Sequence, residues 1–145
     1  LTKRADVRLR GEGRDAPERV ARWRRLALEA AKQSGRARLP EVGAPVEFAA
    51  LLAAEAGAAG VDEARRLFFT ERGGRGLAET MRAWETHPAK LIALVGAEGG
   101  WDDEEIERAS DANWCAVTFG GRVLRAETAA IVVTGLLQHL YGDLV

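Results

Sequence analysis

Apolar residues recur along the chain with two periods, one typical of helices and one typical of buried strands. Helical spacing predicts helices over about residues 15–34, 46–58, 77–84, 102–112 and 126–141. Short apolar runs predict strands over residues 65–70, 90–95 and 115–118, and the run at 90–95 is almost wholly apolar, which predicts burial on both faces. Because strands alternate with helices, we expect an α/β domain built on a parallel sheet.

The ends of these helices carry local signals. Asp15 and Pro17 predict the start of the first helix, and Gly35 predicts its end. The acidic run that begins at Asp102 has the pattern of a capped helix start, and Gly142 predicts the end of the last helix.

In open parallel sheets, ligands bind beyond the carboxyl ends of the strands. Polar loops follow the three predicted strands at residues 71–76, 96–101 and 119–127, so we expect the functional site where these loops meet. The glycines at 73–76 lack the Lys-Ser/Thr pair of a phosphate-binding loop and the glycine spacing of a dinucleotide site. They predict a surface turn, which argues against a nucleotide-hydrolysing α/β protein.

The second and third loops carry candidate chemistry. Glycines around Glu98 allow a ligand to approach the backbone, and this carboxylate can face a cation, although a plain strand-to-helix turn is the alternative. In the third loop Glu127 and Thr128 suit a helix N-terminus. Arg125 precedes that helix and has either a structural role or a substrate contact.

Composition mainly excludes certain kinds of site and classes of protein. The 145 residues are 47% hydrophobic and 30% charged, which is typical of one globular domain. Cys115 is the single cysteine and lies in an apolar run, so we expect a small buried side chain rather than a catalytic thiol. With two histidines and that cysteine there is no zinc ligand set, and we expect no metal. No apolar run approaches the roughly 20 residues that cross a bilayer, so we expect a cytoplasmic protein without a membrane partner.

Charge is distributed unevenly. Residues 1–40 hold 12 Lys/Arg and five Asp/Glu and carry +7, whereas the other 105 hold nine Lys/Arg and 17 Asp/Glu and carry −8. This asymmetry indicates an end that faces nucleic acid. The alternative is a solvated, arginine-rich helix face.

Two ordered motifs carry a family resemblance. The first is Val95-Gly96-Ala97-Glu98-Gly99-Gly100, and about 20 residues later comes Gly120-Gly121-Arg122-Val123-Leu124-Arg125-Ala126-Glu127-Thr128-Ala129. Together they resemble the SPOUT-class family that methylates N3 of a uridine in bacterial 16S ribosomal RNA, whose patterns are Gly-Pro-Glu-Gly-Gly and Leu-Gly-Pro-Arg-Ile-Leu-Arg-Thr-Glu-Thr-Ala. A third match is the family's Glu-Ala-x-x-Gln-Ser-Gly-Arg stretch, which falls at residues 29–36. Ala97 and Gly121 replace family prolines, and Phe119 replaces a leucine.

The resemblance covers about residues 1–145, most loosely at 44–88. It implies a parallel-sheet SPOUT methyltransferase domain whose C-terminal segment, with the helix at 126–141, forms a trefoil knot. Family members are homodimers with the site near the dimer interface. The family also has an N-terminal RNA-binding barrel and a first strand and helix of the catalytic domain, which this sequence lacks. We therefore expect the 145 residues to be the catalytic part of a longer protein.

The resemblance also implies the cofactor, S-adenosylmethionine, and the RNA substrate in the small ribosomal subunit. The residues it places at the cofactor are Thr70, Glu71, Leu94, Val95, Gly96, Glu98, Gly100, Phe119, Gly120, Val123, Leu124 and Thr128. The candidate for stabilising negative charge on a uracil oxygen is Arg125, and the candidate bases are Glu98 and Glu127.

Basic residues of the first helix and of the segment after it are the expected RNA phosphate contacts: Arg22, Arg25, Arg36 and Arg38. Two other functions stay open. One is a non-catalytic RNA-binding module that kept the fold, and the other is a SPOUT methylase acting on transfer RNA or another ribosomal position.

Overall fold

The computed structural model describes residues 15–57 and 64–144. The chain divides into two compact units. Of the described residues, 15–47 belong to the first unit, and 48–57 with 64–144 belong to the second.

The first unit consists of helix α1 (Asp15–Gln33) and the segment that follows it. The helix ends where predicted, because Gly35 adopts a left-handed conformation with φ of 69°. Two backbone hydrogen bonds close this end, from Gly35 N to Lys32 O at 3.3 Å and from Arg36 N to Ala31 O at 3.0 Å, which is the Schellman pattern. The Arg24 guanidinium donates to Val42 O at 3.1 Å and so ties the following segment to α1.

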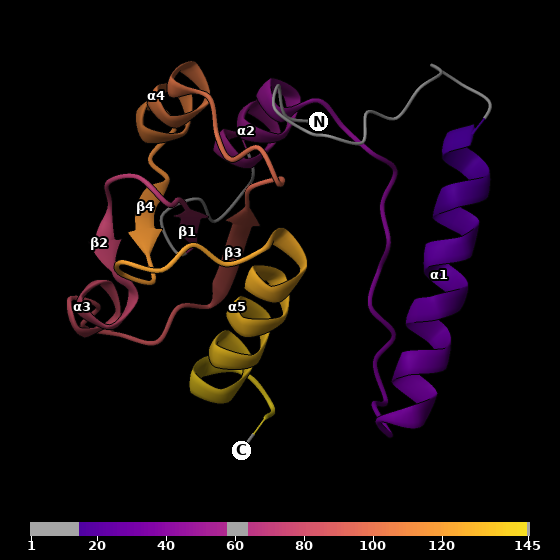
Figure 1. Cartoon of the computed structure of the whole chain (residues 1–145). Helices are drawn as coiled ribbons and strands as arrows, with labels where there is room; N and C mark the ends of the chain where they lie inside the picture. The colour runs from indigo at the N-terminus through magenta and orange to yellow at the C-terminus, as the bar shows by residue number, and fades with distance from the viewer. Residues whose placement is uncertain (1–14, 58–63, 145) are drawn as a thin grey trace. The chain divides into compact units, whose positions relative to one another are not determined.

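The second unit holds the sheet. Its elements in chain order are α2 (Phe48–Ala56), β1 (Ala64–Phe69), β2 (Arg75–Gly76), α3 (Leu77–Arg82), β3 (Lys90–Val95), α4 (Asp103–Asp111), β4 (Cys115–Thr118) and α5 (Ala126–Tyr141). The strands lie in the order β2-β4-β1-β3 (Figure 1). Every neighbouring pair is parallel. The predicted α/β class with a parallel sheet is confirmed.

Helices cover both faces of this sheet. On one face Phe68 of β1 packs with residues of α2 and α4 and with the two indoles of Trp101 and Trp114. On the other face Leu67 and Phe69 pack with residues of α3, β4 and α5. Since successive side chains of a strand point to opposite faces, β1 supplies both layers of the core, and Leu67 and Phe68 are fully buried.

Strand β3 is less buried than its sequence predicts. The expectation of burial on both faces is wrong, because β3 lies at one end of the strand order, where its apolar residues are half-buried and Lys90 is exposed. The central strand β1 takes the buried place instead.

The two-residue strand β2 was not predicted, and it begins within the glycine run 73–76. A Cβ at Gly74 would lie 2.9 Å from the backbone carbon and oxygen of Ala116, so this loop lies directly against β4. Arg75 and Gly76 then pair with Val117 and Thr118. Gly73 and Gly74 are exposed, as the predicted surface turn requires, and the missing side chain at Gly74 allows a close backbone approach to β4.

The helix ends of this unit follow the predicted signals. Asp102 caps α4 in a capping box: its carboxylate accepts from Glu104 N at 3.0 Å, and its own N–H donates to Glu105 at 3.0 Å. Helix α5 ends at Tyr141, directly before Gly142. Within residues 15–57 and 64–144, no helix is long and apolar enough to cross a lipid bilayer.

Candidate functional site

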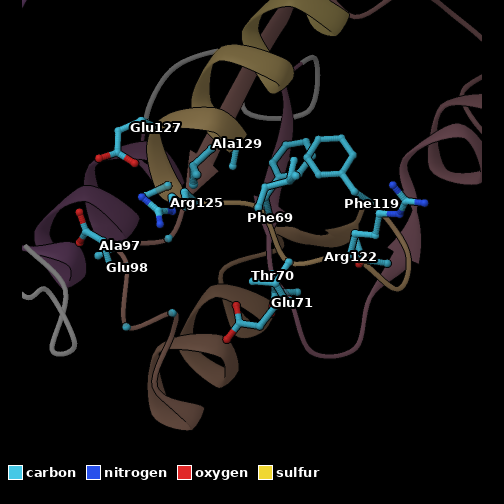
Figure 2. A pocket seen from close by; sticks show the side chains of 18 of the residues that line it. Phe69, Thr70, Glu71, Ala97, Glu98, Phe119, Arg122, Arg125, Glu127 and Ala129 are labelled. Atoms are coloured by element: carbon cyan, nitrogen blue, oxygen red, sulfur yellow. The ribbon is translucent and has the colours of Figure 1, made fainter.

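A cavity of about 470 Å³ opens at the carboxyl ends of β1, β3 and β4 (Figure 2). Small-molecule sites usually occupy about 300–1,000 Å³. Its wall is formed by Phe69, Thr70, Glu71, Val95, Gly96, Ala97, Glu98, Gly99, Gly100, Val117, Thr118, Phe119, Arg122, Val123, Leu124, Arg125, Ala126, Glu127 and Ala129. The three loops that follow the strands therefore converge on one place, as their position after parallel strands predicts.

The first loop is held by the residue that follows β1. Thr70 N donates to Val117 O at 3.0 Å, which continues the pairing with β4 beyond the strand. The Thr70 hydroxyl accepts from Arg72 N and donates to Arg72 O, both at 3.1 Å. Because this hydroxyl closes a local turn, Thr70 shapes the loop and presents Glu71 at the cavity wall.

The second loop is a tight turn that rests on a buried indole. Gly100 N donates to Ala97 O at 2.9 Å, and Gly100 has φ of 69°. The Trp101 side chain is 2% exposed and donates from Nε1 to Phe69 O at 2.8 Å. Gly96 lies against this indole, since a Cβ there would come within 2.8 Å of Nε1. The turn is thus fixed to the end of β1.

The third loop leads from β4 into α5. Gly120 has φ of 85°, donates from its N–H to the Thr118 hydroxyl at 3.2 Å, and accepts from Arg122 N at 2.9 Å. Arg125 is the N-cap residue of α5, and its carbonyl accepts from Ala129 N at 2.8 Å. The Arg125 side chain makes no cap hydrogen bond in the part of the chain that the structure describes, since a guanidinium has no acceptor for the free N–H groups of a helix start.

The cavity has an aromatic side, where Arg122 lies beside Phe119 (Figure 2), and a charged side. Phe69 and Phe119 stack with ring centroids 5.2 Å apart and planes inclined by 27°. Figure 2 shows Arg125, Glu98 and Glu127 gathered on the side away from this aromatic pair. Such a site can take the flat face of a heteroaromatic base on one side and handle charge and protons on the other.

Most of the predicted site residues line this cavity. Among the predicted cofactor residues these are Thr70, Glu71, Val95, Gly96, Glu98, Gly100, Phe119, Val123 and Leu124. The three candidate catalytic residues, Glu98, Arg125 and Glu127, also line it.

Three predicted cofactor residues are absent from the wall: Leu94, Gly120 and Thr128. Leu94 packs against the core on the α2–α4 face of the sheet, and Thr128 is exposed on α5. The sequence prediction missed eight lining residues, namely Phe69, Ala97, Gly99, Val117, Thr118, Arg122, Ala126 and Ala129. Most of them adjoin a predicted residue in the sequence. Their proximity to the motifs is the sequence feature that could have identified them as lining residues.

The proposed RNA-binding arginines lie in the first unit. Arg22 and Arg25 are exposed on α1, and Arg36 and Arg38 are exposed in the segment after it. Their exposure is compatible with phosphate contacts, and their role stays a prediction.

The chain matches the family described as RNA methyltransferase domain over residues 2–138. It is 34% identical over 122 residues to the ribosomal RNA small subunit methyltransferase E of Synechocystis, covering 84% of this chain and 39% of that protein. It is 33% identical over 131 residues to the protein of the same name from Mycobacterium tuberculosis, covering 89% of this chain and 48% of the relative. The chain thus spans about half or less of the length of these relatives.

Two solved structures show the same fold. One is the ribosomal RNA small subunit methyltransferase E of Neisseria gonorrhoeae bound to S-adenosylmethionine, with a TM-score of 0.76, 30% identity, and coverage of 93% of this chain and 54% of that one. The other is a Legionella pneumophila methyltransferase with bound S-adenosylmethionine, with a TM-score of 0.80, 26% identity, and coverage of 97% and 53%.

Proposed function

The chain belongs to the RNA methyltransferase domain family, and on that basis we propose that its cavity binds S-adenosylmethionine for the methylation of ribosomal RNA. The observation that carries the proposal is the convergence of three loops, two of them bearing the family motifs, on one cavity at the carboxyl ends of the strands. The names of the relatives and the cofactor bound in two structural neighbours support it.

The finer proposal is methylation of N3 of a uridine in 16S ribosomal RNA, within the small ribosomal subunit. It is supported by the order and spacing of the motifs at residues 29–36, 95–100 and 120–129. Residues 1–145 are then the catalytic part of a longer SPOUT-class protein, α5 is the threaded helix of a trefoil knot, and the working form is a homodimer. These features come from the family resemblance.

The cavity fits the chemistry of S-adenosylmethionine. Phe119, which stacks on the buried Phe69, offers an apolar surface to an adenine ring. Gly96 and Gly100 leave the backbone of the second loop open to polar groups of the cofactor, and the carboxylates on the charged side suit its positive sulfonium and ammonium groups. The residues that would hold it are the predicted cofactor residues that line the cavity.

When bound, S-adenosylmethionine supplies an electrophilic methyl group on a sulfonium sulfur. The residues of the chain position the uracil, exclude water and handle its N3 proton. That proton is weakly acidic, so a carboxylate, Glu98 or Glu127, accepts it. Arg125 stabilises the negative charge that remains on the uracil carbonyl oxygen, because its guanidinium is permanently cationic and directional.

Calorimetric titration of the chain with S-adenosylmethionine, with ATP and NAD as controls, tests the proposal. We expect saturable binding of S-adenosylmethionine alone. It should also stabilise the fold by about 2.7 kcal/mol at 100 times the dissociation constant, seen as a rise in melting temperature. Absence of binding both to this chain and to the full-length protein would overturn the proposal and favour the non-catalytic RNA-binding module.

A further inference from the structure

Arg72 connects two of the cavity loops without lining the cavity itself. Its Nη2 donates to Trp101 O at 2.7 Å, and its Nη1 lies 3.0 Å from a carboxylate oxygen of Asp103 at the start of α4. Its Nε is 3.8 Å from the Glu71 carboxylate. One guanidinium therefore joins the first loop, the end of the second loop and the start of α4.

Trp101, which this guanidinium contacts, fixes the second loop. Its indole is buried, bonds to Phe69 O and packs on the Phe68 ring with centroids 4.4 Å apart. Gly96, at the other end of the loop, lies against the same indole. The backbone of residues 96–101 thus depends on where Trp101 sits, and the side chain of Arg72 holds the backbone carbonyl of that residue.

We propose that Arg72 is a positioning residue, which keeps residues 96–101 in the conformation that binds the cofactor by holding Trp101. The inference rests on the proposed function, because it concerns the affinity of the same cavity. Ala97 makes such support from outside the loop more important. A proline at this position, as in the family pattern, restricts the backbone, whereas alanine does not.

The two main contacts of Arg72 differ in strength. The Asp103 side chain is 82% exposed and that of Arg72 is 48% exposed, so their ion pair is screened by solvent and contributes little. The bond to Trp101 O is short and charge-assisted, and it ends on the backbone of a buried residue. Arg72→Ala should therefore have a large effect on the loop, and Asp103→Asn a small one.

The experiment measures, for each variant, the dissociation constant for S-adenosylmethionine by calorimetry and the hydrogen exchange of the amides of residues 96–101. We expect Arg72→Ala to weaken binding by at least about tenfold, the factor of a charge-assisted hydrogen bond at the weak end of its usual range, and to speed exchange in the loop. Exchange in β1 should stay unchanged. Asp103→Asn should change affinity by less than about threefold.

Arg108→Ala is the matched control. It removes an arginine from α4 whose guanidinium pairs with Glu104 at 3.7 Å on the surface and for which no bond to the second loop is found within the described residues. We expect wild-type affinity and exchange. Arg72→Lys keeps the charge but not the two-pronged contact, so its affinity should fall between those of wild type and Arg72→Ala.

Rescue separates positioning from general destabilisation. Adding Ala97→Pro to Arg72→Ala should restore affinity to within about threefold of wild type, because the proline restricts the loop from within. Wild-type affinity and exchange in Arg72→Ala would overturn the proposal, and so would a loss of affinity that Ala97→Pro does not repair.

If Arg72→Ala fails to fold, wild-type affinity and loop exchange in Arg72→Lys would overturn the proposal equally. If the wild-type chain and the full-length protein both fail to bind the cofactor, the proposed function fails, and loop exchange still shows whether Arg72 holds the loop.

Discussion

Two glycines of the second loop are required by packing as well as by access to a ligand. A Cβ at Gly96 would lie 2.8 Å from Trp101 Nε1, in the space that the indole needs to reach Phe69 O. A Cβ at Gly100 would meet the Glu71 carboxylate, and the φ of 69° at Gly100 is a conformation that other residues rarely adopt. The Gly-x-Glu-Gly-Gly pattern therefore reflects the packing of the loop against Trp101 and Glu71 as well as the access of a ligand to its backbone.

Gly96→Ala should lower the free energy of unfolding by about 1–3 kcal/mol, because the added methyl group displaces the Trp101 indole and breaks its buried hydrogen bond. Urea unfolding followed by circular dichroism measures the change. Gly121→Ala is the control, since a Cβ at Gly121 meets no heavy atom within 4 Å and its φ is not positive. Equal stability of the two variants would contradict the described contact between Gly96 and Trp101.

The positions of helices and strands could be predicted from local sequence patterns. The burial and pairing of the strands could not, because they depend on tertiary packing. Strands at residues 90–95 and 115–118 were located at the observed bounds, because apolar runs flanked by polar loops are a local signal. The half-buried state of β3 follows from its place in the strand order, which no local pattern encodes. The pairing of β2 depends on the contact of Gly74 with β4, which is equally non-local.

The site shows the same division between local and non-local information. The convergence of the loops could be predicted, because parallel strands end at the same edge of a sheet. The pattern of the strand at 90–95, which is almost wholly apolar, could not predict which of its residues face the cavity. Leu94 and Val95 are neighbours on β3, yet Leu94 packs on the α2–α4 face and Val95 on the face of α3 and α5. Only the tertiary packing distinguishes them.

The exposed arginines of helix α1 predict how RNA affinity depends on salt concentration. Arg22 and Arg25 are exposed on this helix, and each phosphate contact adds about 0.7–0.9 to the slope of log affinity against log salt. In the full-length protein, Arg22→Gln with Arg25→Gln should reduce that slope by about 1.4–1.8 and leave cofactor affinity unchanged. Ribosomal RNA binding measured at several salt concentrations gives the slope. The control is Arg82→Gln on α3, and an unchanged slope in the double variant would exclude these two contacts.

Across the whole molecule, the segment that forms the cavity and the N-terminal segment carry opposite net charges. The cavity lies entirely within residues 41–145, which carry a net charge of −8, whereas residues 1–40 carry +7. A net negative charge disfavours nonspecific binding to phosphates, whereas a net positive charge favours it. We therefore expect the basic residues 1–40 to contribute more to RNA affinity than residues 41–145.

The full-length protein should methylate N3 of a uridine in small ribosomal subunits that lack the modification. Because we propose that residues 1–145 are the catalytic part of a longer protein, we expect the 145-residue chain to bind cofactor but to turn over at least about 10²-fold more slowly. Mass spectrometry of digested RNA measures the methylation rate of both proteins.

Full-length Arg125→Ala should lower kcat by about 10²–10³ without weakening cofactor binding, since its guanidinium is proposed to act on charge that develops only during the reaction. Arg82→Ala on α3 is the control. Full activity of the isolated chain would contradict the division of roles, and full activity of Arg125→Ala would remove that residue from the mechanism.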